Sequence, residues 1–320
     1  MNHSPRLGLA LGSGGARGLA HAGVLDALEE AGLRPHLVAG TSMGSIVGAL
    51  YCEDPSAARV WPRLHGYCTN EEFASYWATF VPRDHNGDEI SRVTRLASLF
   101  DHMQRKLVEV KTVTRLSVEN SERLRRPLLE LFGEASFADL EIPFAAVAMD
   151  LITGKPVVFR DGGLVDAVYA SSAIPAVFPP LESKGMLICD GGGPYRVPVE
   201  ACRALGADVV VAVDIPAFDS TRFSTGLDLI LRSNAVARQR LNHFVCATAD
   251  VVIRPSVGQF HWADFRQGTA CRARGYAAAR DAIPELQKIL RDWTGLRARL
   301  RRRAERHFGL GPRIPLEEPL

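Results

Sequence analysis

A serine between glycines is the first group in this sequence that could do chemistry. Residues 40 to 44 read Gly-Thr-Ser-Met-Gly, a G-x-S-x-G pattern. The segment "PHLVAG" predicts a buried strand that ends just before this serine, and "SMGSIVGALYC" predicts a helix that begins at it. Ser42 would lie on the sharp turn that a nucleophilic serine needs, and the N–H of Met43 would face an anion at the helix N-terminus. Small residues also occur at such turns for packing reasons alone.

A glycine loop, "GSGGARG" over residues 12 to 18, follows the first predicted strand, "RLGLAL". The N–H groups of such a loop can bind dinucleotide phosphates or the oxyanion of a tetrahedral intermediate. The dinucleotide pattern needs a third glycine where Gly12-x-Gly14-x-x-Arg17 has arginine. It also needs an acidic residue after the second strand, which ends in "HLVAG". These departures favour an oxyanion hole beside Ser42.

Two kinds of residue could accept the proton of Ser42. A triad in the α/β-hydrolase order would supply an acid and then a histidine after the serine. The histidines after Ser42 are His65, His85, His102, His243, His261 and His307. The sequence predicts a loop after a strand for His261 alone, and helices or a basic tail for the others. A loop histidine beside a tryptophan is more often structural.

The other candidate base is Asp190, in "LICDGGGPYRVP". Asp190 ends an apolar run that is predicted to be a strand of a parallel sheet. A carboxylate at that end of a strand projects toward the crevice where sites form. Asp-Gly pairs also cap turns, so residue chemistry alone leaves both interpretations open.

Alternating strand and helix patterns connected by glycines predict an α/β fold with a parallel sheet. Further strands are predicted at "PFAAVAMDL", "PVVFR", "MLICD", "ADVVVAVDI" and "DVVIRP", the first two joined by a turn at residues 152–155. Residues 55–135 lack strand signals and are rich in Arg and Leu, which predicts a helical insert. One domain over residues 6–290, followed by a basic helical tail over 291–320, is the simplest division.

Four motifs occur in the order and approximate spacing of the patatin-like phospholipases: "GSGGARGLAHAGVL", "AGTSMGS", "SSAIPAVFPP" and "DGG". From about Leu7 to about residue 290 the chain resembles bacterial members related to the catalytic domain of neuropathy target esterase. The resemblance implies a three-layer α/β fold, with a mostly parallel central sheet, helices on both faces and a helical insert. It also implies a Ser–Asp dyad that uses no histidine.

Carried over by motif, Ser42 is the nucleophile and Asp190 the base. The resemblance places Gly12, Gly14, Gly15 and Arg17 in the oxyanion-hole motif, which Met43 completes. It implies a serine esterase of lipid degradation that cleaves phospholipids, lysophospholipids or related esters through an acyl-enzyme, without metal or cofactor. A lipid acyltransferase and a lipid-binding regulator are the alternatives. One departure, Pro194-Tyr195-Arg196 where relatives commonly carry asparagines, affects the expected acyl or head-group preference.

The composition is that of a soluble globular protein: 320 residues, 47% hydrophobic and 23% charged, with a net charge of +2. Six cysteines without C-x-x-C spacing favour reduced thiols and no zinc site. No signal peptide or spanning segment is predicted, so we expect a cytoplasmic protein, peripheral at most at the inner membrane surface. Arginines over residues 297–306 fit a solvated helix face or contact with anionic lipid, and no motif indicates nucleic acid. The oligomeric state stays open.

Overall fold

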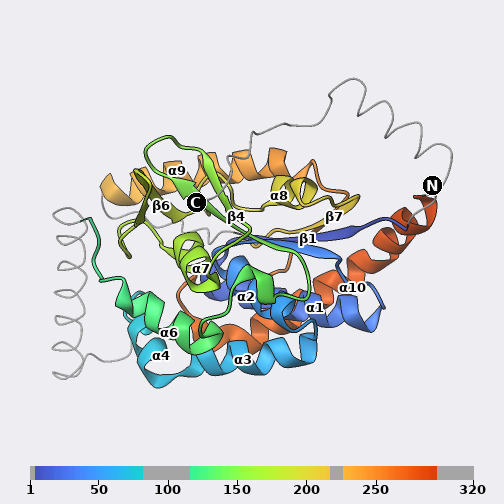
Figure 1. The fold of residues 1–320 in the computed structure, drawn as a ribbon, viewed down its shortest axis with the longest axis horizontal. Helices are drawn as coiled ribbons and strands as arrows, with labels where there is room; N and C mark the ends of the chain where they lie inside the picture. The colour runs from blue at the N-terminus through green and yellow to red at the C-terminus, as the bar shows by residue number, and fades with distance from the viewer. Residues whose placement is uncertain (1–3, 82–115, 217–225, 294–320) are drawn as a thin grey trace, which may run out of the picture.

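One mostly parallel sheet runs through the molecule (Figure 1). The computed structural model describes residues 4–81, 116–216 and 226–293. Within them the sheet has eight strands in the order β5-β6-β3-β2-β1-β7-β8, and β4 pairs with β3 off this path. The strands are β1 (Leu7–Leu11), β2 (Leu37–Thr41), β3 (Phe144–Asp150), β4 (Pro156–Phe159), β5 (Leu181–Ser183), β6 (Met186–Asp190), β7 (Val209–Val213) and β8 (Val251–Ile253).

Helices cover both faces of this sheet, which confirms the predicted three-layer fold (Figure 1). They are α1 (Ala20–Glu30), α2 (Met43–Glu53), α3 (Ala57–Thr69), α4 (Glu71–Ala78), α6 (Glu122–Phe132), α7 (Leu164–Ser172), α8 (Val199–Ala204), α9 (Gly226–Cys246) and α10 (Gly268–Asp292). Short 3₁₀ helices are η1 (Gly15–Leu19), η2 (Phe137–Asp139) and η3 (Phe265–Gln267). None of the helices in the described ranges combines the length and apolar character needed to span a bilayer.

The two faces of the sheet pack into two separate cores, because neighbouring residues of a strand point in opposite directions. Along β1, Leu9 and Leu11 pack into the larger core with α1 and α2. Ala10 points the other way, into a smaller core that includes Cys202 of α8 and Cys246 of α9. All six cysteines are buried free thiols.

Strand direction departs from the sequence prediction at one place that matters for function. β6 was expected to be parallel, but it runs antiparallel to β3 and forms a hairpin with β5. The turn of that hairpin contains Lys184 and Gly185, both with positive φ, as a tight two-residue turn requires. The predicted turn at residues 152–155 does join an antiparallel pair, β3 and β4.

The predicted helical insert is only partly within the described residues. There it comprises α3, α4 and α6, which pack beside α1, α2 and α7. Residues 82–115 of the insert and residues 294–320, which hold the arginine run of the predicted tail, lie outside the described residues.

The last helix, α10, packs against the first, α1, at very short range. A Cβ atom at Gly23 would overlap the carbonyl oxygen of Arg272, and one at Gly275 would overlap that of Ala20. Beside this crossing the Arg272 guanidinium forms an ion pair with Asp26 at 2.7 Å. Gly23 of α1 and Gly275 of α10 therefore allow the backbones of these two helices to pack in direct contact.

Candidate active site

Ser42 lies on a strained turn between β2 and α2. Its backbone has φ 56° and ψ −125°, a conformation that side-chain-bearing residues rarely adopt. The Ser42 N–H donates to Ser171 Oγ at 2.9 Å, and Ser171 Oγ donates to the carbonyl oxygen of Val147 at 2.7 Å. The turn is thus held from α7 and β3, as strain at a functional position requires.

The glycines of the G-x-S-x-G pattern are explained by close backbone contact. A Cβ atom at Gly40 would overlap the carbonyl oxygen of Gly44, and one at Gly44 would overlap the carbonyl oxygen of Leu11. The first turn of α2 therefore lies directly against the end of β1. This contact brings the N-terminus of α2 next to the glycine loop that follows β1.

Asp190 reaches Ser42 because β2 and β6 meet end to end along β3. β2 pairs with β3 as far as Thr41, which lies opposite Val147. The next residue of β3, Ala148, pairs with Asp190, the last residue of β6. Both partners on β3 also pair with β4, so β2 and β6 occupy the same other side of β3. Antiparallel β6 thus delivers its last residue to the end of β2.

The two side chains make direct contact at that point. The Ser42 hydroxyl hydrogen-bonds the Asp190 carboxylate, and Asp190 Oδ1 also accepts the Gly192 N–H at 2.6 Å. Ser42 is 5% exposed and Asp190 7% exposed. Burial raises the pKa of Asp190 from 3.8 to about 6, although these two hydrogen bonds and the charges of Arg196 and Arg238 act to lower it. A carboxyl group with that pKa is a far better proton acceptor than an ordinary aspartate.

The glycine loop after β1 leaves two backbone donors for an anion. The N–H groups of Gly12, Ser13 and Ala16 donate to Val213, Arg196 and Trp262 carbonyl oxygens at 3.0, 2.8 and 2.7 Å. Within the described residues, no hydrogen bond engages the N–H of Gly14 or Gly15. The N–H of Met43, in the first turn of α2, is also without an intrahelical acceptor.

Two residues carried over with the oxyanion-hole motif have supporting contacts. The Gly12 N–H is used in holding the loop to β7. Buried Arg17 turns its Nε toward the carbonyl oxygen of Gly14 at 3.4 Å. Both contacts shape the loop, whereas the N–H groups with no described hydrogen bond belong to Gly14, Gly15 and Met43.

His21 supports the same loop and was not singled out from the sequence. Burial lowers the pKa of His21 to about 4, so its ring is neutral near pH 7. Its Nε2 then donates to the carbonyl oxygen of Gly12 at 2.7 Å. A histidine four residues after Arg17, on the first turn of the following helix, was the available signal.

His261, the alternative candidate base, has its described contacts with Ala263 and Trp262. Its Nδ1 accepts the Ala263 N–H at 3.3 Å, and its ring lies 5.6 Å from that of Trp262. Burial lowers the pKa of His261, and the charge of Arg17 lowers it further. The described hydrogen bond of the Ser42 hydroxyl goes to Asp190.

Comparison with known proteins assigns the chain to a family. The model of a family described as patatin-like phospholipase matches residues 9–203, which contain both Ser42 and Asp190. The chain belongs to the patatin-like phospholipase family.

Its relatives include the proteins suggested by the sequence motifs. It is 34% identical over 221 residues to the patatin-like phospholipase domain-containing protein 6 of Homo sapiens, covering 68% of this chain and 14% of that protein. It is 34% identical over 212 residues to an uncharacterized NTE family protein of Mycobacterium tuberculosis, covering 66% of this chain and 49% of that protein. This chain thus spans half or less of these relatives. Among solved structures, VipD from Legionella pneumophila has a TM-score of 0.46 at 16% identity, over 90% of this chain and 67% of that one.

The segment Pro194-Tyr195-Arg196 of this patatin-like chain lines the dyad. The Tyr195 carbonyl oxygen accepts the Thr41 hydroxyl at 3.0 Å, and the Arg196 carbonyl oxygen accepts the Ser13 N–H. The Arg196 guanidinium donates to the carbonyl oxygen of Ile215. Burial lowers the pKa of Arg196, which the charges of Asp214 and Asp190 partly offset. The sequence departure therefore places a cation beside the candidate base.

An aromatic cluster borders the loop on another side. Trp262, whose carbonyl oxygen holds Ala16, lies 5.7 Å from Trp77 and 5.9 Å from Phe80 between ring centroids. Phe178, from the "SSAIPAVFPP" motif, lies 6.0 Å from Trp77. These rings form an apolar wall next to the candidate oxyanion hole.

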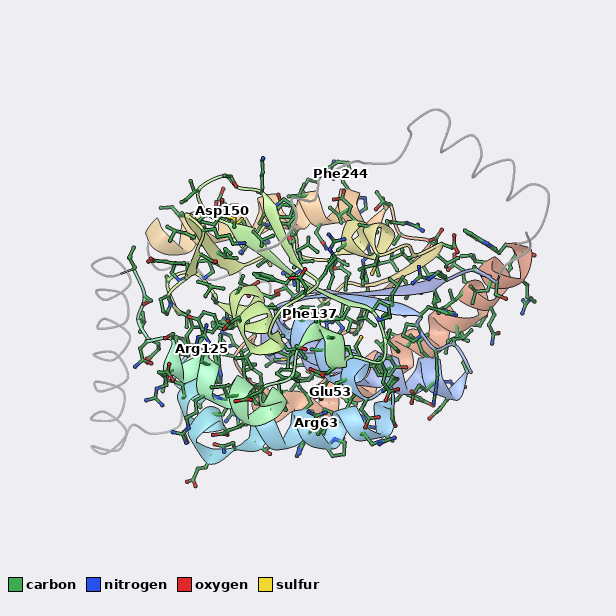
Figure 2. All side chains as sticks on the ribbon, in the orientation of Figure 1. Glu53, Arg63, Arg125, Phe137, Asp150 and Phe244 are labelled. Atoms are coloured by element: carbon green, nitrogen blue, oxygen red, sulfur yellow. The ribbon has the colours of Figure 1, made fainter. Side chains whose placement is uncertain are left out.

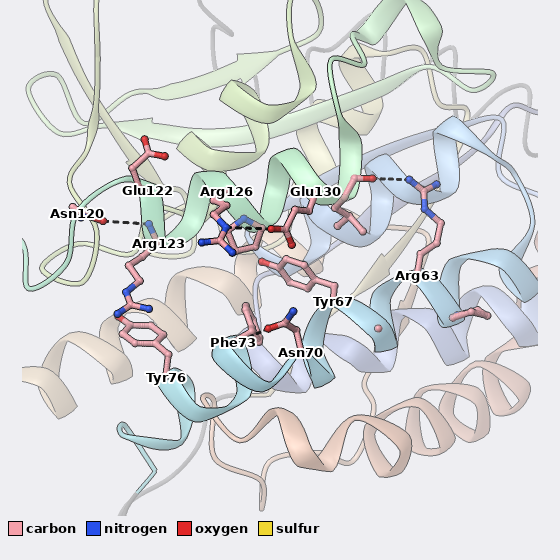
Figure 3. A pocket seen from close by; sticks show the side chains of 14 residues that line it. Arg63, Tyr67, Asn70, Phe73, Tyr76, Asn120, Glu122, Arg123, Arg126 and Glu130 are labelled. Carbon is pink, nitrogen blue, oxygen red and sulfur yellow. Dashed lines mark hydrogen bonds and ion pairs between the residues drawn. The ribbon is translucent and has the colours of Figure 1, made fainter.

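A cavity of about 540 Å³ lies beyond this wall, between α3, α4 and α6 (Figure 3). Phe73 and Tyr76 line it, and their rings lie 5.9 and 5.3 Å from that of Trp77. Its arginines have partners, such as Arg126, which bonds Glu130 at 3.2 Å (Figure 3). Neither Ser42 nor Asp190 lines this cavity, so it is separate from the candidate active site.

Proposed function

We propose that the chain is a serine hydrolase that cleaves carboxylic ester bonds of phospholipids, lysophospholipids or related lipid esters. The observation that carries the proposal is the hydrogen bond from the Ser42 hydroxyl to Asp190, a carboxylate whose pKa is raised to about 6 by burial. Membership of the patatin-like phospholipase family supports a lipid ester as the substrate.

The first half of the reaction would form an acyl-enzyme. Ser42 Oγ attacks the ester carbonyl carbon while Asp190 accepts the hydroxyl proton. The carbonyl oxygen becomes an oxyanion, and the N–H groups of Gly14, Gly15 and Met43 are the donors available to bind it. The intermediate then collapses, and the departing alcohol takes its proton from Asp190.

The second half would return the enzyme to its starting state. Water loses a proton to Asp190 as its oxygen attacks the acyl carbon, and Ser42 Oγ leaves with that proton. The loop donors bind the same oxyanion again. Trp77 and Phe178 are buried, so the half-buried Trp262 is the ring of this cluster that could contact the acyl chain beside the reacting carbonyl.

The experiment that tests this function combines covalent labelling with turnover. A fluorophosphonate probe should label the native chain at Ser42 and fail to label Ser42→Ala. Ser172→Ala is a matched control. Ser172 is buried beside Ser171, and the Ser172 hydroxyl has no described hydrogen-bond partner. A panel of phospholipids, lysophospholipids and short-chain esters would then identify the substrate class. Labelling at another serine, or turnover that survives Ser42→Ala, would refute the proposal.

A further inference from the structure

Helix α9 exposes an apolar face to the outside of the molecule. Five large apolar side chains on it are between 44% and 60% exposed: Leu229, Ile230, Val236, Leu241 and Phe244. Figure 2 shows the Phe244 side chain at the outer edge of the molecule, on the far side of α9 from the sheet. At about 100° per residue, the five positions span about 140° of the helix circumference. They therefore form one continuous surface, named here the α9 apolar face.

The opposite side of α9 is anchored, which fixes this orientation. Asn242 is 7% exposed, and its Nδ2 donates to Asp214 Oδ1 at 2.8 Å. Cys246 is buried in the smaller core under the sheet face. An ordinary surface helix turns its apolar side to the core. In α9 the polar Asn242 faces inward, and the apolar face is turned outward.

From Leu229 onward, the charged residues of α9 are all arginines. The sequence from Leu229 to Cys246 contains no Asp or Glu, and it contains Arg232, Arg238 and Arg240. Arg240 lies within the span of the α9 apolar face, with its guanidinium carbon 5.4 Å from the centre of the Phe244 ring. Arg232 and Arg238 lie outside that span, and apolar side chains on one face with arginines on the other are typical of helices that lie in the head-group region of a membrane.

The anchor of α9 also connects it to the candidate active site. Asp214 is followed by Ile215, whose side chain packs against Gly14, where a Cβ atom would come within 2.7 Å of Ile215 Cγ2. The guanidinium of Arg196 donates to the carbonyl oxygen of Ile215. On the helix itself, Arg238 is close enough for its charge to act on Asp190. The anchored side of α9 therefore lies near the dyad, and the apolar face lies on the other side of the same helix.

We propose that α9 is an interfacial helix, whose apolar face enters the head-group region of an anionic phospholipid bilayer while its arginines contact lipid phosphates. Its role in bringing the dyad to lipid rests on the proposed function. Charge argues against two other occupants. A two-fold dimer through this face would bring Arg240 of both copies into one apolar interface. The second occupant would be this chain's own arginine-rich segment, residues 297–306, which would add further positive charge beside the arginines of α9.

Binding of the full chain to vesicles tests the proposal without any turnover. Vesicles of phosphatidylcholine alone and of phosphatidylcholine with phosphatidylglycerol serve as the lipid surface. The triple variant Leu229→Ser, Ile230→Ser, Phe244→Ser should bind the anionic vesicles at least tenfold more weakly than the native chain. The matched control Leu151→Ser, Ile152→Ser removes two side chains of 47% and 63% exposure from the β3–β4 turn and should bind as the native chain does.

A fluorescent label reports whether α9 itself enters the lipid. The six native cysteines are buried, so an introduced exposed cysteine can be labelled selectively. An environment-sensitive dye on Ser233→Cys, within the α9 apolar face, should shift its emission to the blue with anionic vesicles. The same dye on Ala58→Cys, exposed on α3 at the opposite side of the molecule, should not (Figure 1).

Several results would overturn the inference. These are native-like vesicle binding by the triple variant, no binding by the native chain, an unchanged dye on Ser233→Cys, or a dimer in light scattering that the triple variant loses. Failure of the proposed function is distinguishable from these. A chain that binds vesicles through α9 but hydrolyses no ester refutes only the function, whereas hydrolysis of soluble esters without α9-dependent binding refutes only the inference.

Discussion

Replacing the candidate base by its amide should make the protein more stable while abolishing its activity. Burial raises the pKa of Asp190 to about 6, so the folded chain binds this proton more tightly than the unfolded chain, whose pKa is near 3.8. Folding stability therefore falls as pH rises from about 4 to about 6, and it stays lower above 6. A difference of about two pKa units corresponds to about 3 kcal/mol. Asp190→Asn removes the charge, and its amide oxygen can still accept the Gly192 N–H.

Urea unfolding of the native chain and of Asp190→Asn at pH 4 and pH 8 measures this effect. The unfolding free energy of the variant minus that of the native chain should be about 2 to 3 kcal/mol larger at pH 8 than at pH 4. Asp161→Asn, at an exposed carboxylate, is the control and should change stability by less than about 0.5 kcal/mol. If Asp190→Asn gains no stability over the native chain at pH 8, the carboxylate is not strained by burial and the reasoning is wrong.

Three further predictions concern catalysis. The acidic limb of kcat/KM should lie near pH 6, because Asp190 must be deprotonated to accept the Ser42 proton; a pH–rate profile that stays flat from pH 5 to 8 contradicts this. His261→Ala should keep most activity and the same acidic limb, so loss of the limb in this folded variant would identify the histidine as the base. Gly14→Ala should lower kcat about 10²-fold or more in a steady-state ester assay, because a Cβ atom would press on Ile215 and displace an oxyanion donor; near-native kcat would exclude that N–H as a donor.

The local parts of the fold could be predicted from the sequence. β1, β2 and α2 follow from short apolar runs, glycines and a helical pattern that are complete within about 15 residues each. The elbow at Ser42 was predicted for the same reason. The direction of β6 could not be, since a short apolar run reads the same in a parallel and an antiparallel strand. The Lys184-Gly185 pair, which forms the tight turn between β5 and β6, was the local signal for an antiparallel hairpin.

The contacts that assemble the candidate site join residues far apart in the chain. Asp190 meets Ser42 only because β2 and β6 share one side of β3, and no periodicity in the sequence carries that information. Ser171, which accepts the Ser42 N–H, and His21, which holds Gly12, act through single hydrogen bonds. The roles of the dyad and loop residues stay predictions. Likewise, an amphipathic pattern in α9 does not tell which side of the helix faces the protein.

The pairing of the oxyanion loop with late residues has a consequence for biosynthesis. β1 is made first but pairs with β7, and the Ala16 N–H needs the carbonyl oxygen of Trp262. A nascent chain that has left the ribosome only as far as residue 203 has an unpaired β1 edge and a glycine loop without its anchors. The loop can take its final shape only after Trp262 emerges, so a growing polypeptide holds its serine beside an unfinished oxyanion hole until that residue has been added.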